Sequence, residues 1–395
     1  MYLIVLGLGV FGLITSTVFT GMVLVAVASY LRERRLLAGM PAAGGFTPPL
    51  SLLKPLHGAE PDLDAHLASF FEQDYPVYEI LFCARSADDA GLTVARGVAA
   101  RYPHIPAKFF STGGQPPYIN DKALSMERMG AAAAHDILVI SDSDVRVTPD
   151  YLRAVAMPFV QERVGGMCCP YRGVAGQAGI LAGLWARLEA VGMSVEMTSG
   201  VLVARMMEGM QFTLGPTMAF RRETIRKMGG FKVTADYCAD DFVLGNETFK
   251  LGETVVLSHH TIDHMVLNSR FADSMKHQVR WMKSTRFSRP KGHFGTALTF
   301  SMPFAMLAWA EAAWFHHPWI GFALFAWGLA TRVVLAIAVG RKVVRDPSWF
   351  SLIVLYPIRD FMGLFFWLAS YTGRTILWRG QVYELLPGGK MRAAK

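Results

Sequence analysis

Two aspartates separated by one residue are the feature of this sequence best suited to chemistry. Asp142 and Asp144 come just after the apolar run 137–140, which reads Ile-Leu-Val-Ile. A strand that ends in Asp-x-Asp presents both carboxylates near one point, where a divalent cation would bridge them to a diphosphate. Turns and helix caps are the more common use of such a short acidic cluster. The pair therefore indicates a metal site only if other polar groups gather around it.

Three further polar groups occur along the chain. Asp88-Asp89 follows an earlier apolar run, and Asp240-Asp241 lies in a later loop. The third group precedes the C-terminal apolar block and consists of His277, Arg280 and Trp281. Each group has a plainer interpretation, because aspartates also cap helices and an Arg-Trp belt also marks a membrane interface.

The region that holds these residues alternates short apolar runs with helical patterns. The runs cover 50–53, 78–84, 107–110 and 136–141, and Pro, Gly or charged residues bound each of them. Continuous apolar runs are typical of parallel strands that are covered on both faces. We therefore expect an α/β domain in which ligands bind at the carboxyl ends of the strands.

Composition indicates a membrane protein. The chain has 395 residues, of which 52% are hydrophobic and only 18% charged. Residues 2–30 carry no charged side chain, and such a run is long enough to cross a bilayer. A cleaved signal peptide is the alternative, although no basic residue precedes the run. The basic segment 31–35 predicts that the chain leaves this span on the cytoplasmic side.

A second apolar block begins near Gly295. We expect Gly295–Phe315 and Trp319–Val339 to form a hairpin of two spans. The segment 349–371 carries Pro357, Arg359 and Asp360 at its middle, so we expect it to be bent or re-entrant, with the two charges paired. The expected domains are an N-terminal transmembrane helix (1–31), a cytoplasmic catalytic domain (32–293), a membrane region (294–372) and a basic cytoplasmic tail (373–395).

Charge and cysteine content exclude several other classes. Much of the Lys and Arg excess behind the net charge of +8 lies at the ends of apolar segments, which favours anionic lipid head groups and a phosphorylated substrate over nucleic acid. The four cysteines contain no C-x-x-C and suggest neither a disulfide framework nor a zinc ribbon. His259, His260 and His264 lack the spacing of a structural zinc site.

Taken in order, the motifs resemble those of ceramide glucosyltransferases. They are 51–56, Gln73-Asp74-Tyr75-Pro76, Asp88-Asp89, Ile119-Asn120-Asp121-Lys122, Asp142 with Arg146, Gly229-Gly230, Ala239-Asp240-Asp241 and Arg280-Trp281. The sequence is also similar to bacterial hopanoid-associated glycosyltransferases of the same superfamily. The resemblance covers about 50–284. It implies a GT-A fold (Rossmann-like, nucleotide-sugar-binding) with transmembrane helices at both ends, placed in a bacterial inner membrane.

The resemblance also implies the substrates: a UDP-sugar donor of the glucose or N-acetylglucosamine class, a divalent cation (Mn²⁺ or Mg²⁺), and a hydroxyl of a membrane lipid such as ceramide or a hopanoid polyol. Asp89 would lie near the uridine, with Asn120 and Lys122 beside the nucleotide. Asp142 matches the second signature aspartate, and Asp144 would hold the metal with it. A helix cap is the alternative role for Asp89, and a solvated turn is the alternative for Asn120 and Lys122.

The remaining motif residues would act on the reacting bond. Asp241 matches the family's general base, with Asp240 orienting it, and attack by a lipid hydroxyl in a single displacement would invert the anomeric carbon. Arg280 would stabilise the leaving diphosphate. The set is completed by Trp281 as an apolar wall, His277 in place of the family's Gln or Arg, and Gly215 in a stretch that faces the donor.

The sequence leaves a second function open. A lipid-binding or transport scaffold with an inactive transferase domain would share the membrane segments, although the intact aspartates and Arg280-Trp281 argue against decay. The sugar, the acceptor, the metal and the oligomeric state are not determined by the sequence.

Overall fold

The computed structural model describes residues 2–39, 45–176, 183–268, 270–378 and 380–394. The chain divides into two compact units, each built from separate stretches. We call Met1–Leu37, Arg172–Met207 and Val266–Gly388 the helical unit, and Ala38–Tyr171, Glu208–Met265 and Gly389–Lys395 the sheet unit. Part of the predicted catalytic region, including His277, therefore belongs to the helical unit.

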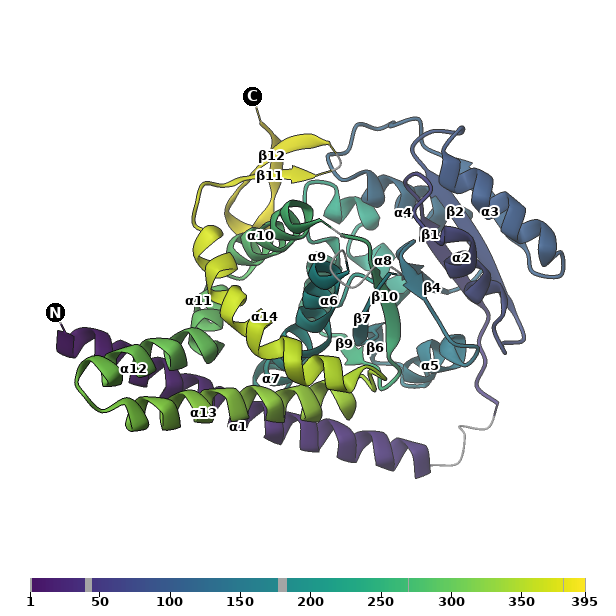
Figure 1. Cartoon of the computed structure of the whole chain (residues 1–395). Coiled ribbons are helices and arrows are strands. Elements are labelled where there is room, and N and C mark those ends of the chain that lie inside the picture. Colours follow the sequence, from purple (N-terminus) through teal and green to yellow (C-terminus); the bar gives the residue numbers. More distant parts are fainter. Residues whose placement is uncertain (1, 40–44, 177–182, 269, 379, 395) are drawn as a thin grey trace. The chain divides into compact units, whose positions relative to one another are not determined.

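A seven-stranded sheet with the order β3-β2-β1-β4-β8-β6-β9 forms the centre of the sheet unit (Figure 1). Its strands are β1 (Leu50–Pro55), β2 (Tyr78–Ala84), β3 (Ala107–Ser111), β4 (Ile137–Ser141), β6 (Val164–Cys168), β8 (Thr217–Arg221) and β9 (Thr254–Leu257). The four predicted strands are confirmed and pair in parallel. The sheet as a whole is mixed, because β8 runs antiparallel to both β4 and β6.

Helices and short strands complete the sheet unit. They are α2 (Leu63–Phe71), α3 (Ala90–Arg101), α4 (Asp121–Ala132), β5 (Val145–Arg146), α5 (Tyr151–Ala156), η1 (Met157–Val160), α8 (Arg222–Lys227), η3 (Phe231–Thr234), α9 (Asp240–Lys250), β10 (Ile262–Val266) and β13 (Met391–Ala393). Every residue of β1, β2 and β4 is buried, as the continuous apolar runs predict. The polar residues after these strands are thus held by a rigid framework.

The helical unit contains the apolar helices. Its elements are α1 (Tyr2–Gly39), β7 (Tyr171–Ala175), α6 (Leu184–Val191), η2 (Gly192–Met197), α7 (Thr198–Glu208), α10 (Phe271–Ser288), α11 (Pro290–Thr296), η4 (Ala297–Thr299), α12 (Met302–Trp314), α13 (Pro318–Leu335), η5 (Ala336–Arg341), α14 (Trp349–Ala369), β11 (Thr375–Trp378), β12 (Gln381–Leu385) and η6 (Pro387–Gly389). Among the described residues, three helical segments are long and apolar enough to cross a membrane: Gly7–Leu37, Pro318–Arg341 and Trp349–Ala369.

The expected span Gly295–Phe315 is not one helix. The chain leaves the helical path at Phe300, whose backbone is extended, and α12 then covers only 13 residues. A helix of that length rises about 20 Å, which is too short to cross the hydrocarbon core. Pro303 in the first turn of α12 suits a helix start, since proline lacks the N–H that an internal turn requires.

The segment expected to be bent or re-entrant forms one helix, α14, with Pro357 inside it. The expected pairing of its charges is confirmed, although each pairs with another segment. Asp360 accepts from Arg332 of α13 at 2.7 Å, and Arg359 lies 3.3 Å from Glu196 of η2. Both charges thus have partners inside the protein. Their presence at the middle of α14 is therefore compatible with an apolar environment around the helix.

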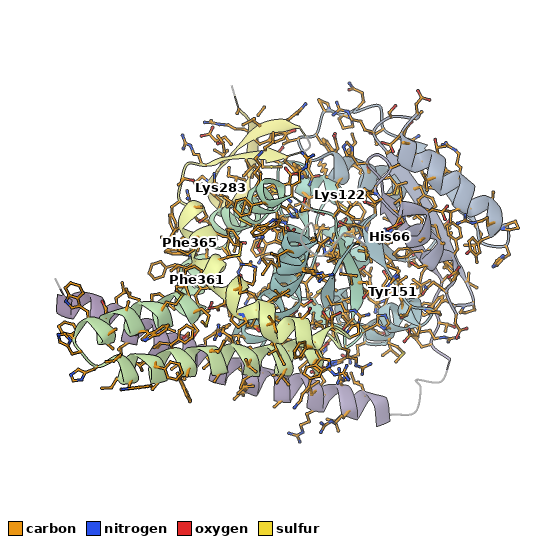
Figure 2. The ribbon with its side chains drawn as sticks, in the orientation of Figure 1. His66, Lys122, Tyr151, Lys283, Phe361 and Phe365 are labelled. Carbon is orange, nitrogen blue, oxygen red and sulfur yellow. The ribbon has the colours of Figure 1, made fainter. Side chains whose placement is uncertain are left out.

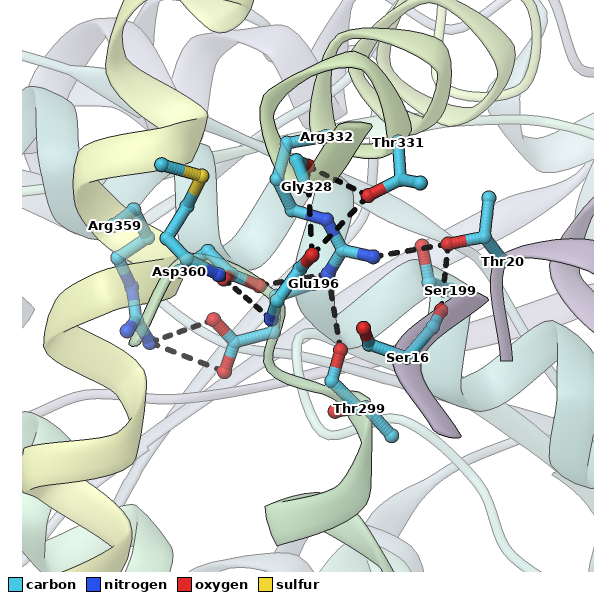
Figure 3. Close-up of polar contacts among 12 residues, drawn as sticks. Ser16, Thr20, Glu196, Ser199, Thr299, Gly328, Thr331, Arg332, Arg359 and Asp360 are labelled. Carbon is cyan, nitrogen blue, oxygen red and sulfur yellow. Dashed lines mark hydrogen bonds and ion pairs between the residues drawn. The ribbon is translucent and has the colours of Figure 1, made fainter. Parts of the chain in front are cut away.

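Arg332 and Asp360 form the centre of a buried polar network (Figure 3). Arg332 also donates to the Thr299 carbonyl (3.0 Å) and to the Thr20 hydroxyl of α1 (2.9 Å). The second oxygen of Asp360 accepts from the backbone N–H groups of Ser301 (2.8 Å) and Met302 (2.7 Å), at the start of α12. One ion pair therefore joins α1, α13 and α14 and satisfies the N–H groups that the interrupted span exposes.

We predict that Arg332→Met destabilises the protein by about 3–5 kcal/mol, because it leaves the Asp360 carboxylate buried without a counter-charge. Unfolding of the purified protein in one detergent measures the loss. The double variant Arg332→Met/Asp360→Asn should recover most of the stability, since the amide oxygen still accepts the backbone hydrogen bonds. A single variant as stable as the wild type would contradict this account.

Candidate active site

The centre of the candidate site is the buried ammonium group of Lys122, near the start of α4 (Figure 2). Its Nζ lies 2.8 Å from Oδ1 of Asp142 and 3.0 Å from Oδ2 of Asp240. Burial alone would lower the pKa of Lys122, but the two carboxylates outweigh burial and raise it. Lys122 is therefore a permanent cation that joins the loop after β4 to the first turn of α9, and it does not lie in the solvated turn that was its alternative role.

Asp144 faces His264, a histidine that the sequence did not predict as a site residue. Antiparallel pairing of β5 with β10 puts His264 opposite Val145, and the His264 Nε2 lies 3.0 Å from the Asp144 Oδ2. Desolvation would raise the pKa of Asp144, yet His264 and Lys54 together hold it below the ordinary value. The Asp144 Oδ1 is buried and has no hydrogen-bond partner among the described residues.

These contacts test whether the residues fit a divalent cation. A carboxylate oxygen without a hydrogen bond and a neighbouring imidazole are donors that suit Mn²⁺. Asp142, the other expected ligand, is instead engaged by Lys122 through Oδ1, and desolvation raises its pKa. Among the described residues, no group of three His, Cys, Asp or Glu side chains is placed to hold a metal. The protein would thus supply only part of a coordination shell.

Asp241 is fixed by backbone donors at the start of α9. Its Oδ2 accepts from the N–H of Gly215 at 2.9 Å, and its Oδ1 accepts from the N–H of Phe242 at 2.8 Å. Burial, with a contribution from Asp240, raises the pKa of Asp241 to about 6. A Cβ at position 215 would lie 3.2 Å from the same carboxylate oxygen, so glycine gives the loop its close approach. Gly215 and Asp241, which the sequence analysis named as separate site residues, therefore meet.

Asp89 caps a helix, as its alternative interpretation predicts, whereas Asn120 is a buried helix cap and not part of the solvated turn that was its alternative. Asp89 caps α3 by accepting from the N–H of Gly91 (2.8 Å), and it also accepts from the N–H of Gly58 (3.0 Å). Asn120 caps α4 by accepting from the N–H of Lys122 (2.9 Å). The Asn120 cap fixes the helix turn that carries the central lysine. A role of either residue toward a nucleotide stays a prediction.

His277, Arg280 and Trp281 all lie on α10 of the helical unit. The His277 Nδ1 is 2.6 Å from a carboxylate oxygen of Glu189, a buried residue of α6. Burial would raise the pKa of Glu189, but His277, Ser274 and Asn268 lower it through hydrogen bonds and charge. The ring of Trp281 lies 4.3 Å from that of His277. The aspartates belong to the sheet unit, so the assembly of both groups into one site stays a prediction.

Three residues with clear contacts escaped the sequence reading of the site. The buried Lys54 of β1 donates to the Asp142 carbonyl at 2.5 Å, and burial lowers its pKa to about 7. A lysine inside an apolar strand was the available signal. To predict His264 as a site residue, one would have to know that β5 pairs with β10. To predict Glu189, one would have to know that α6 packs against α10.

We predict that Lys122→Met lowers the free energy of unfolding by about 3–5 kcal/mol, because Asp142 and Asp240 would lose the charge between them. Lys122→Arg keeps the charge and should lose less, and Lys232→Met, at an exposed lysine of the same unit, should be close to neutral. Chemical unfolding of the three variants checks this. Equal losses for Lys122→Met and Lys232→Met would show that the bridge is unimportant.

A solved structure supports the fold. The chain is similar to a mannosyltransferase, PcManGT from Pyrobaculum calidifontis, solved in complex with GDP-Man and Mn²⁺. The TM-score is 0.50, the sequences are 17% identical, and the match covers 92% of this chain and 97% of that one. The predicted GT-A fold is confirmed.

Sequence comparisons identify the family. Ceramide glucosyltransferase 1 of Caenorhabditis elegans is 23% identical over 360 residues, which cover 88% of this chain and 74% of that protein. Ceramide glucosyltransferase of Komagataella phaffii is 33% identical over 118 residues, which cover 29% of this chain and 22% of that protein. The sequence pattern of glycosyl transferase family 21 matches residues 13–391. The chain therefore belongs to glycosyl transferase family 21, as the resemblance to ceramide glucosyltransferases predicts.

Proposed function

We propose that this glycosyltransferase moves a sugar from a UDP-sugar to the hydroxyl of a membrane lipid, with inversion at the anomeric carbon. The observation that carries the proposal is Asp241, a carboxylate with a raised pKa that backbone N–H groups hold beside Gly215. Asp240, Lys122 and Asp142 connect this carboxylate to the Asp-x-Asp segment. A single displacement requires a general base and a group that holds the diphosphate. In this proposal Asp241 is the base, and the Asp-x-Asp segment holds the diphosphate.

In the proposed reaction Asp241 is the general base. A lipid hydroxyl is a weak nucleophile at neutral pH, so its oxygen attacks the anomeric carbon as its proton passes to Asp241. The bond to the diphosphate breaks, and UDP leaves with the bonding electrons. The environment of Asp241 supports this role, because a carboxylate with a higher pKa is a stronger base while it remains ionised at neutral pH.

Asp144 and His264 would hold a divalent cation, Mn²⁺ or Mg²⁺, with the diphosphate completing the shell. Such an ion would supply positive charge beside the diphosphate as it departs. The proposal rests on the Asp144 oxygen without a hydrogen bond and on the 3.0 Å approach of His264. Asp142 is then a positioning residue, because Lys122 already neutralises it. The mannosyltransferase with the similar fold is complexed with both a nucleotide sugar and Mn²⁺.

A lipid acceptor is supported by an apolar groove of the helical unit. The groove has a volume of about 300 Å³ and lies between α1 and the α11–η4 segment, and no charged residue lines it. Ile14 and Val18 form one wall, and Leu298 forms part of the other. The second wall belongs to the elements that follow α10, on which Arg280 and Trp281 lie. We infer that a lipid reaches Arg280 and Trp281 along this groove without leaving the bilayer. The catalytic domain would then lie on the cytoplasmic side of the membrane.

We predict that Asp241→Asn lowers turnover by roughly 10² to 10⁴-fold and leaves UDP binding intact, since the change removes the base but little volume. The wild-type kcat/KM should rise with pH through about 6, because the protonated carboxyl group cannot accept a proton. UDP release with a lipid acceptor measures both effects. Asp236→Asn, at an exposed aspartate of the same unit, is the control. Near-normal turnover in Asp241→Asn would exclude the assignment.

A second prediction concerns the metal. Asp144→Asn and His264→Gln should each weaken Mn²⁺ binding by about 10-fold or more, because each replaces a carboxylate or imidazole ligand by a neutral amide, which is a weaker ligand. Calorimetry with MnCl₂ and UDP provides a readout that does not depend on turnover. His260→Gln, on a neighbouring histidine that contacts Thr148 and Asp150, should leave Mn²⁺ binding unchanged. Loss of affinity in Asp142→Asn alone would move the metal to the other aspartate.

A further inference from the structure

A second groove of the helical unit differs from the apolar one in its charge. It has a volume of about 310 Å³ and lies between α1 and the end of the α13–η5 segment. Leu24, Val27 and Leu31 of α1 and Ala338 of η5 give it apolar walls. The two helices run side by side (Figure 1), and the Trp327 indole N–H donates to the Thr17 hydroxyl at 2.9 Å. Both walls thus belong to one packed bundle.

Three exposed cations line the same groove: Arg32 and Arg35 from α1, and Lys342 just after η5. In the part of the chain that the structure describes, none of them pairs with an acidic side chain. The acidic residue beside them in sequence, Glu33, forms an ion pair with Arg205 of α7. The groove therefore carries positive charge from both walls and no acid of its own.

The position of these cations along the helices matches a lipid head group. Twenty helical residues rise about 30 Å, the thickness of the hydrocarbon core. Counted from Pro318, where α13 begins, this length ends near Ala338, and Lys342 lies about one turn beyond. On α1, Thr20 is level with Arg332 through their hydrogen bond, and Arg32 lies three turns further toward the same end. The cations thus fall where the hydrocarbon ends and the head groups begin.

We propose that this groove binds one anionic phospholipid, with the phosphate among Arg32, Arg35 and Lys342 and an acyl chain along Leu24, Val27 and Ala338. The bound lipid is distinct from the acceptor, whose proposed groove has no charged lining. The proposal depends only on the helical unit and stands whether or not the proposed reaction is correct.

Charge selects the class of lipid. Each basic residue near an anionic membrane surface strengthens binding by about fivefold, so three cations favour a head group with net negative charge. A zwitterionic head group also carries an ammonium group, which would need an acidic partner, and Glu33 is already paired. The apolar walls add the condition that the phosphate must carry an acyl chain.

The test compares lipid retention by the full-length protein in detergent. The protein is incubated with equal amounts of phosphatidylglycerol and phosphatidylcholine, and native mass spectrometry counts the bound lipids. The wild type should retain one phosphatidylglycerol in preference to phosphatidylcholine. Arg32→Gln/Lys342→Gln, with one cation removed from each wall, should weaken retention by roughly thirtyfold. Ala28→Trp, which fills the groove without changing charge, should also abolish retention.

The matched control is Arg341→Gln/Lys291→Gln, which removes the same charge from exposed residues outside the groove lining and should bind normally. Competition with soluble glycerol phosphate separates a lipid site from a free phosphate site. The proposal is overturned if both lipids bind equally, if the control loses as much as the groove variant, if Ala28→Trp binds normally, or if glycerol phosphate displaces the lipid at equal concentration.

Discussion

The bridge from Lys122 to Asp142 and Asp240 is the interaction on which the candidate site depends. Two carboxylates that meet below the surface repel each other and lose hydration, and both costs fall when one ammonium group lies between them. The bridge ties the loop after β4 to the start of α9. These two elements also place the proposed metal ligand and the proposed base: Asp144 is two residues beyond Asp142, and Asp241 follows Asp240.

Arg332 and Asp360 of the helical unit are also buried charges that stabilise each other. A charge in an apolar bundle persists only if the protein supplies its partners, and Asp360 receives an ion pair and two backbone N–H groups. These contacts allow the chain to break its helix between η4 and α12 and still bury the break. Close packing supports the arrangement, since a Cβ at Gly9 would meet the α12 backbone at 2.9 Å from the Ala308 nitrogen.

The sequence predicted what is encoded locally. Strands β1, β2 and β4 were found because each is an apolar run that is buried along its whole length, and β3 was found from a short apolar run that is only partly buried. The N-terminal span was found because a bilayer requires a long uncharged run. It did not predict the antiparallel entry of β8, the shortness of α12 or the contact of His264 with Asp144. Each of these depends on a partner distant in sequence: β4 and β6 for β8, Asp360 for the start of α12, and the β5–β10 pairing for His264.

The chemistry of the aspartates is set by their neighbours more than by their spacing. Asp144 and Asp241 belong to one acidic cluster, yet their pKa values move in opposite directions. Asp144 faces a histidine and stays an anion, which suits a group that binds a cation. Asp241 is buried beside Asp240, and burial and the neighbouring carboxylate raise its pKa more than Lys122 and the backbone N–H donors lower it. Environments that push the pKa values of like groups apart are how a fold assigns electrostatic and proton-transfer roles to identical side chains. The lowered pKa of Asp144 is therefore consistent with a ligand role, and the raised pKa of Asp241 is consistent with a base role. The opposite assignment would disagree with the direction of both pKa shifts.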